Sequence, residues 1–224
     1  MSCAETSLRA SSKLTTRGRE AVNVATPRTK GRAGLSDLPA GPHDEPAASE
    51  PRQTSAFTLR IELVEDAGDW SAFGDGAALA TLIQNAADAV ARAGPDALRI
   101  PGPGRLAEAV VALSSDTEVA ALNGQYRGKK KPTNVLSFPA DDIRPGDAAG
   151  AMLGDIVLAL ETVRREASLE DKQFDHHLRH LVIHGLLHLF GYDHMNDDEA
   201  RIMESLERDA LARMGIGDPY AGEA

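Results

Sequence analysis

A histidine-rich segment toward the C-terminal end of the chain carries the residue types and the spacing that could do chemistry. Residues 180–194 read HLVIHGLLHLFGYDH, with His180, His184 and His188 four residues apart and His194 six residues further on. The apolar residues of this segment recur at helical spacing, which predicts a helix with a buried stripe and with the first three histidines on another face. Residues four apart in a helix lie about 5–6 Å apart at their Cβ atoms, so two neighbouring histidines can bind one metal ion.

Gly191 indicates which pair of histidines that would be. His180 and His188 are two turns apart, about 12 Å along the axis, which is too far for a shared ion. A glycine just beyond the last apolar position of a helix typically ends it with a left-handed turn. The chain would then reverse and bring His194 close to His188 rather than to His180. We therefore predict that His184, His188 and His194 bind one metal ion.

Three histidines with an open fourth position are typical of a catalytic metal site rather than a structural one. Zn²⁺ suits these ligands best, with nickel or another transition ion as the alternative. We expect His180 to lie outside the site, a contact behind the ligands or with the substrate being the alternative. His176 and His177 are expected to face solvent.

The spacing of the three histidines equals that of the metalloprotease motif H-E-x-x-H-x-x-G-x-x-H, with one change. Gly185 stands where that motif has its glutamate, the general base that activates the metal-bound water. Without it, peptide hydrolysis by that mechanism lacks a proton acceptor. A glycine inside a helix also costs about 1 kcal/mol relative to alanine, which indicates a close approach by a substrate or another backbone, or simple packing.

A second candidate for chemistry is the basic segment YRGKKKP at residues 126–132. The guanidinium of Arg127 could bind a phosphate through two hydrogen bonds. Lys129, Lys130 and Lys131 could attract a nucleic-acid backbone in a salt-dependent way, although a solvated loop explains them equally well. Tyr126 is expected in the core, with stacking on a base as the alternative.

These residues must be positioned by an alternation of strands and helices over residues 57–224. Hydrophobic periodicity predicts strands and helices in the order β-α-β-α-β-β-α-α-α. Asp116 is a plausible cap of the second helix, and Asn196 and Glu199 resemble the start of the last one. We predict a single α+β domain with a roughly four-stranded mixed sheet covered by helices. The expected elements are strands at 58–66, 108–116, 134–139 and 155–160, and helices at 76–93, 116–127, 161–168, 175–190 and 197–214.

The composition narrows the class of protein. The chain has 224 residues and a net charge of −10, which argues against a general nucleic-acid coat protein but allows an RNA enzyme with local positive charge. Its only cysteine, Cys3, excludes an internal disulfide and a cysteine-based zinc site. Residues 1–56 lack periodicity, and we expect a disordered N-terminal extension there, an organelle-targeting segment or a wrongly assigned start being alternatives. We find no membrane span and no signal peptide in the sequence.

Several long motifs resemble the YbeY family of bacterial ribosomal-RNA maturation factors. The resemblance spans roughly residues 58–222 and rests on HGLLHLFGYDH at 184–194, LNGQYRGKKKPTNVLSFP at 122–139, LGDIVLAL at 153–160 and MGIGDPY at 214–220. It implies a zincin-like fold with a metal in a cleft, bound by His184, His188 and His194, and a functional role for Arg127. It also implies a cytoplasmic endoribonuclease, specific for single strands, that matures the 3′ end of 16S rRNA and acts in ribosome quality control.

The family's partners would be precursor 16S rRNA and the small ribosomal subunit, with a ribosomal protein and an assembly GTPase suggested by analogy. Neither DNA nor a membrane is expected as a partner. The alternatives are a metalloprotease-like hydrolase and a non-catalytic ribosome-assembly factor with a structural metal. The general base is not identified: Asp193 and Asp155 are candidates for orienting a histidine, and a purely structural role is open for both.

Overall fold

The computed structural model describes residues 22–23, 57–94, 98–100 and 105–221. Apart from Val22 and Asn23, the expected disordered extension at residues 1–56 lies outside the described residues. Val22–Asn23 forms the short strand β1, which pairs antiparallel with a strand of the main domain. This strand was not expected from the sequence, because two residues carry no periodicity.

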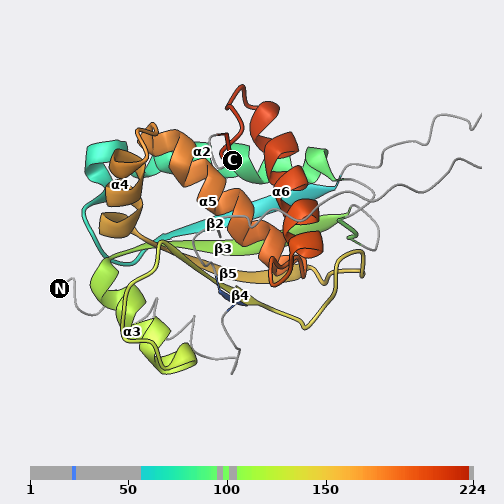
Figure 1. Ribbon diagram of the computed structural model, residues 1–224, viewed down its shortest axis with the longest axis horizontal. Coiled ribbons are helices and arrows are strands. Elements are labelled where there is room, and N and C mark those ends of the chain that lie inside the picture. The colour runs from blue at the N-terminus through green and yellow to red at the C-terminus, as the bar shows by residue number, and fades with distance from the viewer. Residues whose placement is uncertain (1–21, 24–56, 95–97, 101–104, 222–224) are drawn as a thin grey trace, which may run out of the picture.

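The order of the remaining elements confirms the predicted α+β fold (Figure 1). A short 3-10 helix, Trp70–Phe73, follows the first long strand. The described elements of the domain are β2 (Thr58–Glu65), α2 (Gly76–Ala93), β3 (Leu106–Ser114), α3 (Asp116–Arg127), β4 (Val135–Pro139), β5 (Met152–Ala159), α4 (Leu160–Leu169), α5 (Phe174–Leu189) and α6 (Asp197–Ala212).

The strands form one mixed sheet in the order β1-β4-β5-β3-β2. β2, β3 and β5 are parallel to one another, and β4 runs antiparallel to β5. Helices α2, α4, α5 and α6 cover one face of the sheet, whereas α3 covers the other (Figure 1). Both faces of the central strands are therefore buried, as expected for a largely parallel sheet.

Helix α5 lies at the centre of the larger layer. It contacts β4 and β5 below it and α2, α4 and α6 beside it. Its last two turns are buried on nearly every side, from Leu181 to Leu189. A helix so enclosed holds its side chains in fixed positions, which is what a metal site on this helix requires.

Two helix starts test the predicted caps. Ser115, not Asp116, caps α3: its side chain accepts a hydrogen bond from the backbone of Glu118, so that prediction was wrong by one residue. Asp116 instead accepts from the backbone of Thr162 at the start of α4. Asn196 caps α6 as predicted, accepting hydrogen bonds from the backbone N–H groups of Asp198 and Glu199.

Replacing Asn196 with alanine is expected to lower the free energy of unfolding by about 1 kcal/mol, because two N–H groups of α6 lose their acceptor. Chemical denaturation with constant slope measures this change. Asn196→Asp keeps an acceptor oxygen and should retain most of the stability. Equal losses in both variants would contradict the capping role.

Within the described part of the chain, no helix is long and apolar enough to cross a membrane.

Candidate metal centre

Helix α5 ends in a reversal built around Gly191. The backbone of Gly191 has φ +83°, the left-handed conformation predicted for it. Its N–H donates to the carbonyl of His188 at 3.0 Å, and the N–H of Tyr192 donates to the carbonyl of Leu187 at 3.1 Å. These two bonds form a Schellman motif, which ends the helix and turns the chain back beside its last turn.

The reversal brings together the three histidines that the sequence singled out. The Nε2 atoms of His184 and His188 lie 3.0 Å apart. The ring of His194 lies 5.4 Å from that of His184 and 5.3 Å from that of His188, measured between centroids. Each of the three rings offers one nitrogen within 4.8 Å of the others, so the cluster could hold a metal ion.

Hydrogen bonds on the far side of two rings fix which nitrogen faces the cluster. His188 Nδ1 lies 2.8 Å from the carbonyl oxygen of Tyr192, and His184 Nδ1 lies 2.6 Å from Oε1 of Glu207. Because both acceptors require a donor, we assign the proton of each ring to Nδ1. Each Nε2 therefore presents a lone pair toward the other, an arrangement that is unfavourable without a cation between them.

The third ring fits the same interpretation. Nε2 of His194 is buried and has no hydrogen-bond partner among the described residues. A buried polar atom without a partner is costly, and binding to a metal removes that cost. Two histidine nitrogens bound at 2.0–2.1 Å to a tetrahedral zinc would lie about 3.3 Å apart, close to the spacing of the Nε2 pair. The residues present therefore fit a metal ion.

The electrostatic environment keeps His188 in the form that binds metals. Burial lowers the pKa of His188 well below its ordinary value, and the neighbouring His184 and His194 lower it further. The ring is therefore neutral at physiological pH, with its lone pair available.

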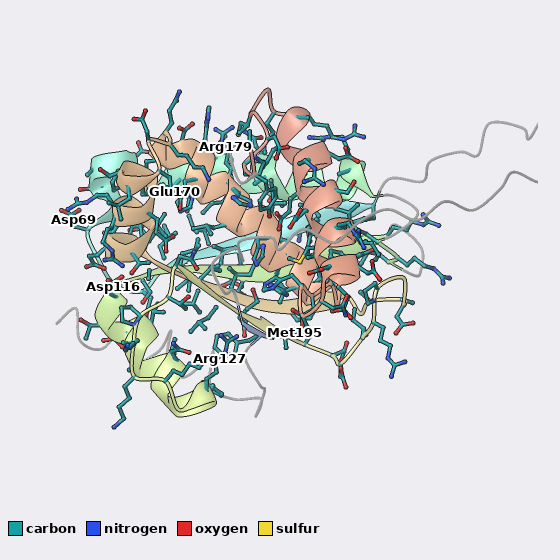
Figure 2. The ribbon with its side chains drawn as sticks, in the orientation of Figure 1. Asp69, Asp116, Arg127, Glu170, Arg179 and Met195 are labelled. Atoms are coloured by element: carbon teal, nitrogen blue, oxygen red, sulfur yellow. The ribbon has the colours of Figure 1, made fainter. Side chains whose placement is uncertain are left out.

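Arg127 is the last residue of α3, and in the view of Figure 2 it lies near Met195, the residue that follows His194. Burial lowers the pKa of this half-buried guanidinium, and the nearby charge of Asp193 opposes that shift. Asp193 in turn accepts a hydrogen bond from the backbone N–H of His194 at 2.8 Å, so it stabilises the turn that delivers this histidine. Arg127 is thus linked electrostatically to the residue that precedes His194.

The residues that follow Arg127 in the sequence line an open groove. Its lining encloses about 540 Å³ and consists of Asn123, Lys129, Lys130, Lys131, Pro132 and Thr133. The three lysines are exposed, whereas Tyr126 packs edge-on against Phe138 with 5.2 Å between ring centroids. Tyr126 is therefore partly buried and packs against the smaller core cluster, close to what was expected.

Two expectations about the other histidines were wrong. His177 is buried and hydrogen-bonds Glu166 at 3.2 Å, whereas the sequence indicated a solvated residue. His180 does not lie apart from the site, because its Nε2 is 3.1 Å from Oε2 of Glu207, the carboxylate that also contacts His184. Both corrections have one cause: the acidic partner comes from another helix, which the local sequence does not show. His176 is partly exposed, with 37% of its side chain accessible, so its predicted contact with solvent is met only in part.

The structure decides between the alternatives for Gly185. A Cβ at this position would lie 3.0 Å from Cδ1 of Ile156 and 3.2 Å from Oγ of Ser137. The carbonyl of Gly185 also accepts a hydrogen bond from that hydroxyl at 3.3 Å. This glycine therefore allows α5 to pack closely on β4 and β5, and it faces the sheet.

Asp155 lies within β5, opposite Phe138 of β4. A role for it in orienting a histidine stays a prediction.

Glu207 is the site residue that sequence reasoning missed. It lies on the buried face of α6 between Met203 and Leu211, each four residues away. A carboxylate at an apolar position of an amphipathic helix was the available signal, because such a charge needs a partner. Burial alone would raise the pKa of Glu207, but the neighbouring His184 and the hydrogen bonds that His184 and His180 donate hold it well below its ordinary value.

Comparisons with known proteins identify the family of this chain. The model of the family described as "Endoribonuclease YbeY" matches residues 76–215. A relative named endoribonuclease YbeY from Allorhizobium ampelinum is 48% identical over 166 residues, covering 74% of this chain and 96% of the relative. One of the same name from Rhodopseudomonas palustris is 48% identical over 186 residues, covering 80% and 89%. A solution structure from Thermotoga maritima aligns with a TM-score of 0.42 and 26% identity, over 70% of this chain and 91% of that one. This chain belongs to the YbeY endoribonuclease family.

Proposed function

We propose that this protein is a metal-dependent endoribonuclease that cleaves single-stranded RNA. His184, His188 and His194 hold one Zn²⁺, and Arg127 binds the phosphate that is cleaved. The observation that carries the proposal is the pair of Nε2 atoms facing each other at 3.0 Å, with both Nδ1 atoms engaged elsewhere. The names of the relatives support the substrate class.

Each group of the site has a separate task. When bound, the ion supplies Lewis-acid chemistry, polarising a phosphoryl oxygen and lowering the pKa of water. The Arg127 guanidinium neutralises charge that develops on the phosphate. Lys129, Lys130 and Lys131 attract the flanking backbone. Since the whole chain carries a net charge of −10, this local positive segment restricts where RNA can approach.

The chemical ends of the RNA products reveal which group attacks the phosphate. Attack by the 2′-hydroxyl of the RNA leaves a 2′,3′-cyclic phosphate, whereas attack by water does not. Mass spectrometry of the fragments distinguishes the two routes.

For the biological substrate we propose the 3′ end of precursor 16S rRNA on the small ribosomal subunit, in the cytoplasm and with a role in ribosome quality control. Membership in the YbeY endoribonuclease family and the local basic groove support this substrate. Mapping the 3′ ends of 16S rRNA in cells that carry only an inactive variant tests it. Correctly matured ends in such cells would contradict the proposal.

The metalloprotease alternative is disfavoured by Gly185. The position that would carry the catalytic glutamate packs directly against Ile156 and Ser137 of the sheet and has no side chain, so it offers no general base. The non-catalytic alternative is tested by RNA cleavage with and without a chelator. We expect chelation to stop cleavage and added Zn²⁺ to restore it, while unfolded protein stays intact throughout. Cleavage that persists after complete metal removal would contradict the proposed function.

Arg127→Ala is expected to lower kcat/KM for a single-stranded RNA by about 10²–10³-fold, because a donor to the transition-state charge is lost. Arg127→Lys should recover only part of the rate, since an ammonium group lacks the two-pronged geometry. Steady-state kinetics measure both variants, and zinc content should stay at the wild-type level.

Lys129→Ala is the matched control for charge. It removes one exposed cation, so it should weaken RNA binding only a few-fold and reduce the salt dependence by about one counterion. An Arg127→Ala enzyme that behaved like this control would contradict the assigned role.

A further inference from the structure

Glu207 is a fully buried carboxylate, with 0% of its surface exposed. The other buried residues of α6 are apolar: Met203, Ala210 and Leu211. Burying a charge in such surroundings is costly unless hydrogen bonds and opposite charges offset the cost. The hydrogen-bonding partners of Glu207 must therefore offset the cost of burying its charge.

Both oxygens of this carboxylate are engaged. Oε1 lies 2.6 Å from Nδ1 of His184. Oε2 lies 3.1 Å from Nε2 of His180 and accepts a hydrogen bond from the hydroxyl of Tyr220. With both oxygens bound, the carboxylate has one orientation, and so does the imidazole that donates to Oε1.

Tyr220 reaches this network from the C-terminal segment that follows α6. Its ring stacks edge-on with that of His180, 5.6 Å between centroids, and the guanidinium of Arg208 lies 5.7 Å from its centroid. Residues Gly217, Asp218 and Pro219, just before it, line a cavity of about 250 Å³ together with His176, His177 and His180. The hydroxyl of Tyr220 thus connects the C-terminal segment to Glu207, and through Glu207 to Nδ1 of His184.

We propose that Glu207 is a positioning residue of the metal centre, and that Tyr220 locks it in place from the C-terminal segment. This inference rests on the proposed function for the identity of the site. Glu207 keeps the proton of His184 on Nδ1 and turns Nε2 toward the ion, while Tyr220 and His180 hold the second oxygen. Partners of this kind typically contribute 10–100-fold to metal affinity.

The variants are Glu207→Gln, Tyr220→Phe and the control Glu204→Gln. Glu204 lies one turn earlier on α6 and pairs with Arg208, not with a histidine. We expect Glu207→Gln to weaken Zn²⁺ binding about 10–100-fold and Tyr220→Phe to weaken it by a smaller factor, up to about tenfold. Glu204→Gln should bind zinc like the wild type. Competition with a chromophoric chelator at fixed pH measures the zinc affinity of the wild type and the three variants.

A spectroscopic readout separates positioning from stability. Long-range ¹H–¹⁵N correlation of the metal-free proteins reports which ring nitrogen of His184 carries the proton. Wild type and Glu204→Gln should show the proton on Nδ1, and Glu207→Gln should show a mixture of both forms. Tyr220→Phe removes only a hydroxyl, so it keeps the test decisive if Glu207→Gln fails to fold.

Three outcomes would overturn the inference. Zinc affinity and proton position could both be unchanged in Glu207→Gln and Tyr220→Phe, which would leave the carboxylate a structural role only. The wild type could bind two ions per chain, with the second held by His180, His184 and Glu207, which lie close enough to do so. The proton of His184 could also lie on Nε2 in the wild type. A wild type that binds no zinc would instead contradict the proposed function, and the proton position would still decide the role of Glu207.

Discussion

A His188→Ala variant is expected to lose bound zinc and to cleave single-stranded RNA at least about 10³-fold more slowly than the wild type. The ion contributes several kcal/mol to stabilising charge in the transition state, and each 1.36 kcal/mol is a factor of ten. His188 is the most buried of the three rings: it faces His184 on one side, contacts the backbone of Tyr192 on the other, and is only 1% exposed. Elemental analysis of the purified protein and single-turnover kinetics measure the two effects.

Two further variants make this result specific. His194→Ala removes a less buried ring, so it should lose zinc and activity with a smaller loss of stability. His176→Ala removes a partly exposed imidazole of the same helix that lies outside the cluster, so it should keep both zinc and activity. Full activity in His188→Ala and His194→Ala would show that the proposed site is wrong, whereas loss in His176→Ala would point to a general fault in folding.

The position of the metal centre could be predicted because its geometry is local. Four residues separate His184 from His188, and Gly191 ends the same helix three residues later. Helical periodicity and the left-handed preference of glycine then place His194 without any knowledge of the rest of the fold. The same local rules identified every long helix to within a few residues.

The partners behind the ligands could not be predicted in this way. Glu207 lies 23 residues after His184, and Glu166 lies 11 residues before His177. Each pair meets only because two helices pack together, so single-sequence periodicity showed a polar residue but not what it would contact. His177 and His180 were misplaced for this reason.

The prediction of strand boundaries was inaccurate for the same reason, because these boundaries depend on residues distant in the sequence. β5 was expected from residue 155 but begins at Met152, because Met152 pairs with Glu108 and Gly154 with Ala109 of β3. Its register is set by the neighbouring strand rather than by its own alternation. β1 exists only through its pairing with β4.

Gly191 is the residue on which the shape of the site depends most. Its φ of +83° is one that residues with a Cβ adopt at a cost of about 1–2 kcal/mol. A Cβ here would also lie 2.8 Å from the carbonyl carbon of Ile143 and closer still to its oxygen. Because these are backbone atoms, no side-chain rotation relieves the contact, and the loop or the end of α5 must move.

Gly191→Ala is therefore expected to lower the free energy of unfolding by roughly 2–5 kcal/mol, combining the left-handed cost with that of overpacking. It should also weaken zinc binding, because the shift moves the carbonyl of Tyr192 that holds His188 and the turn that delivers His194. Gly146→Ala is the matched control: its φ is +85° and no atom lies within 4 Å of the new Cβ, so it should lose only about 1–2 kcal/mol and bind zinc normally. Denaturation of the metal-free proteins and chelator competition separate the two effects. Equal behaviour of the two variants would mean that the close approach to Ile143 does not hold the site together, and that the reversal after α5 tolerates a side chain.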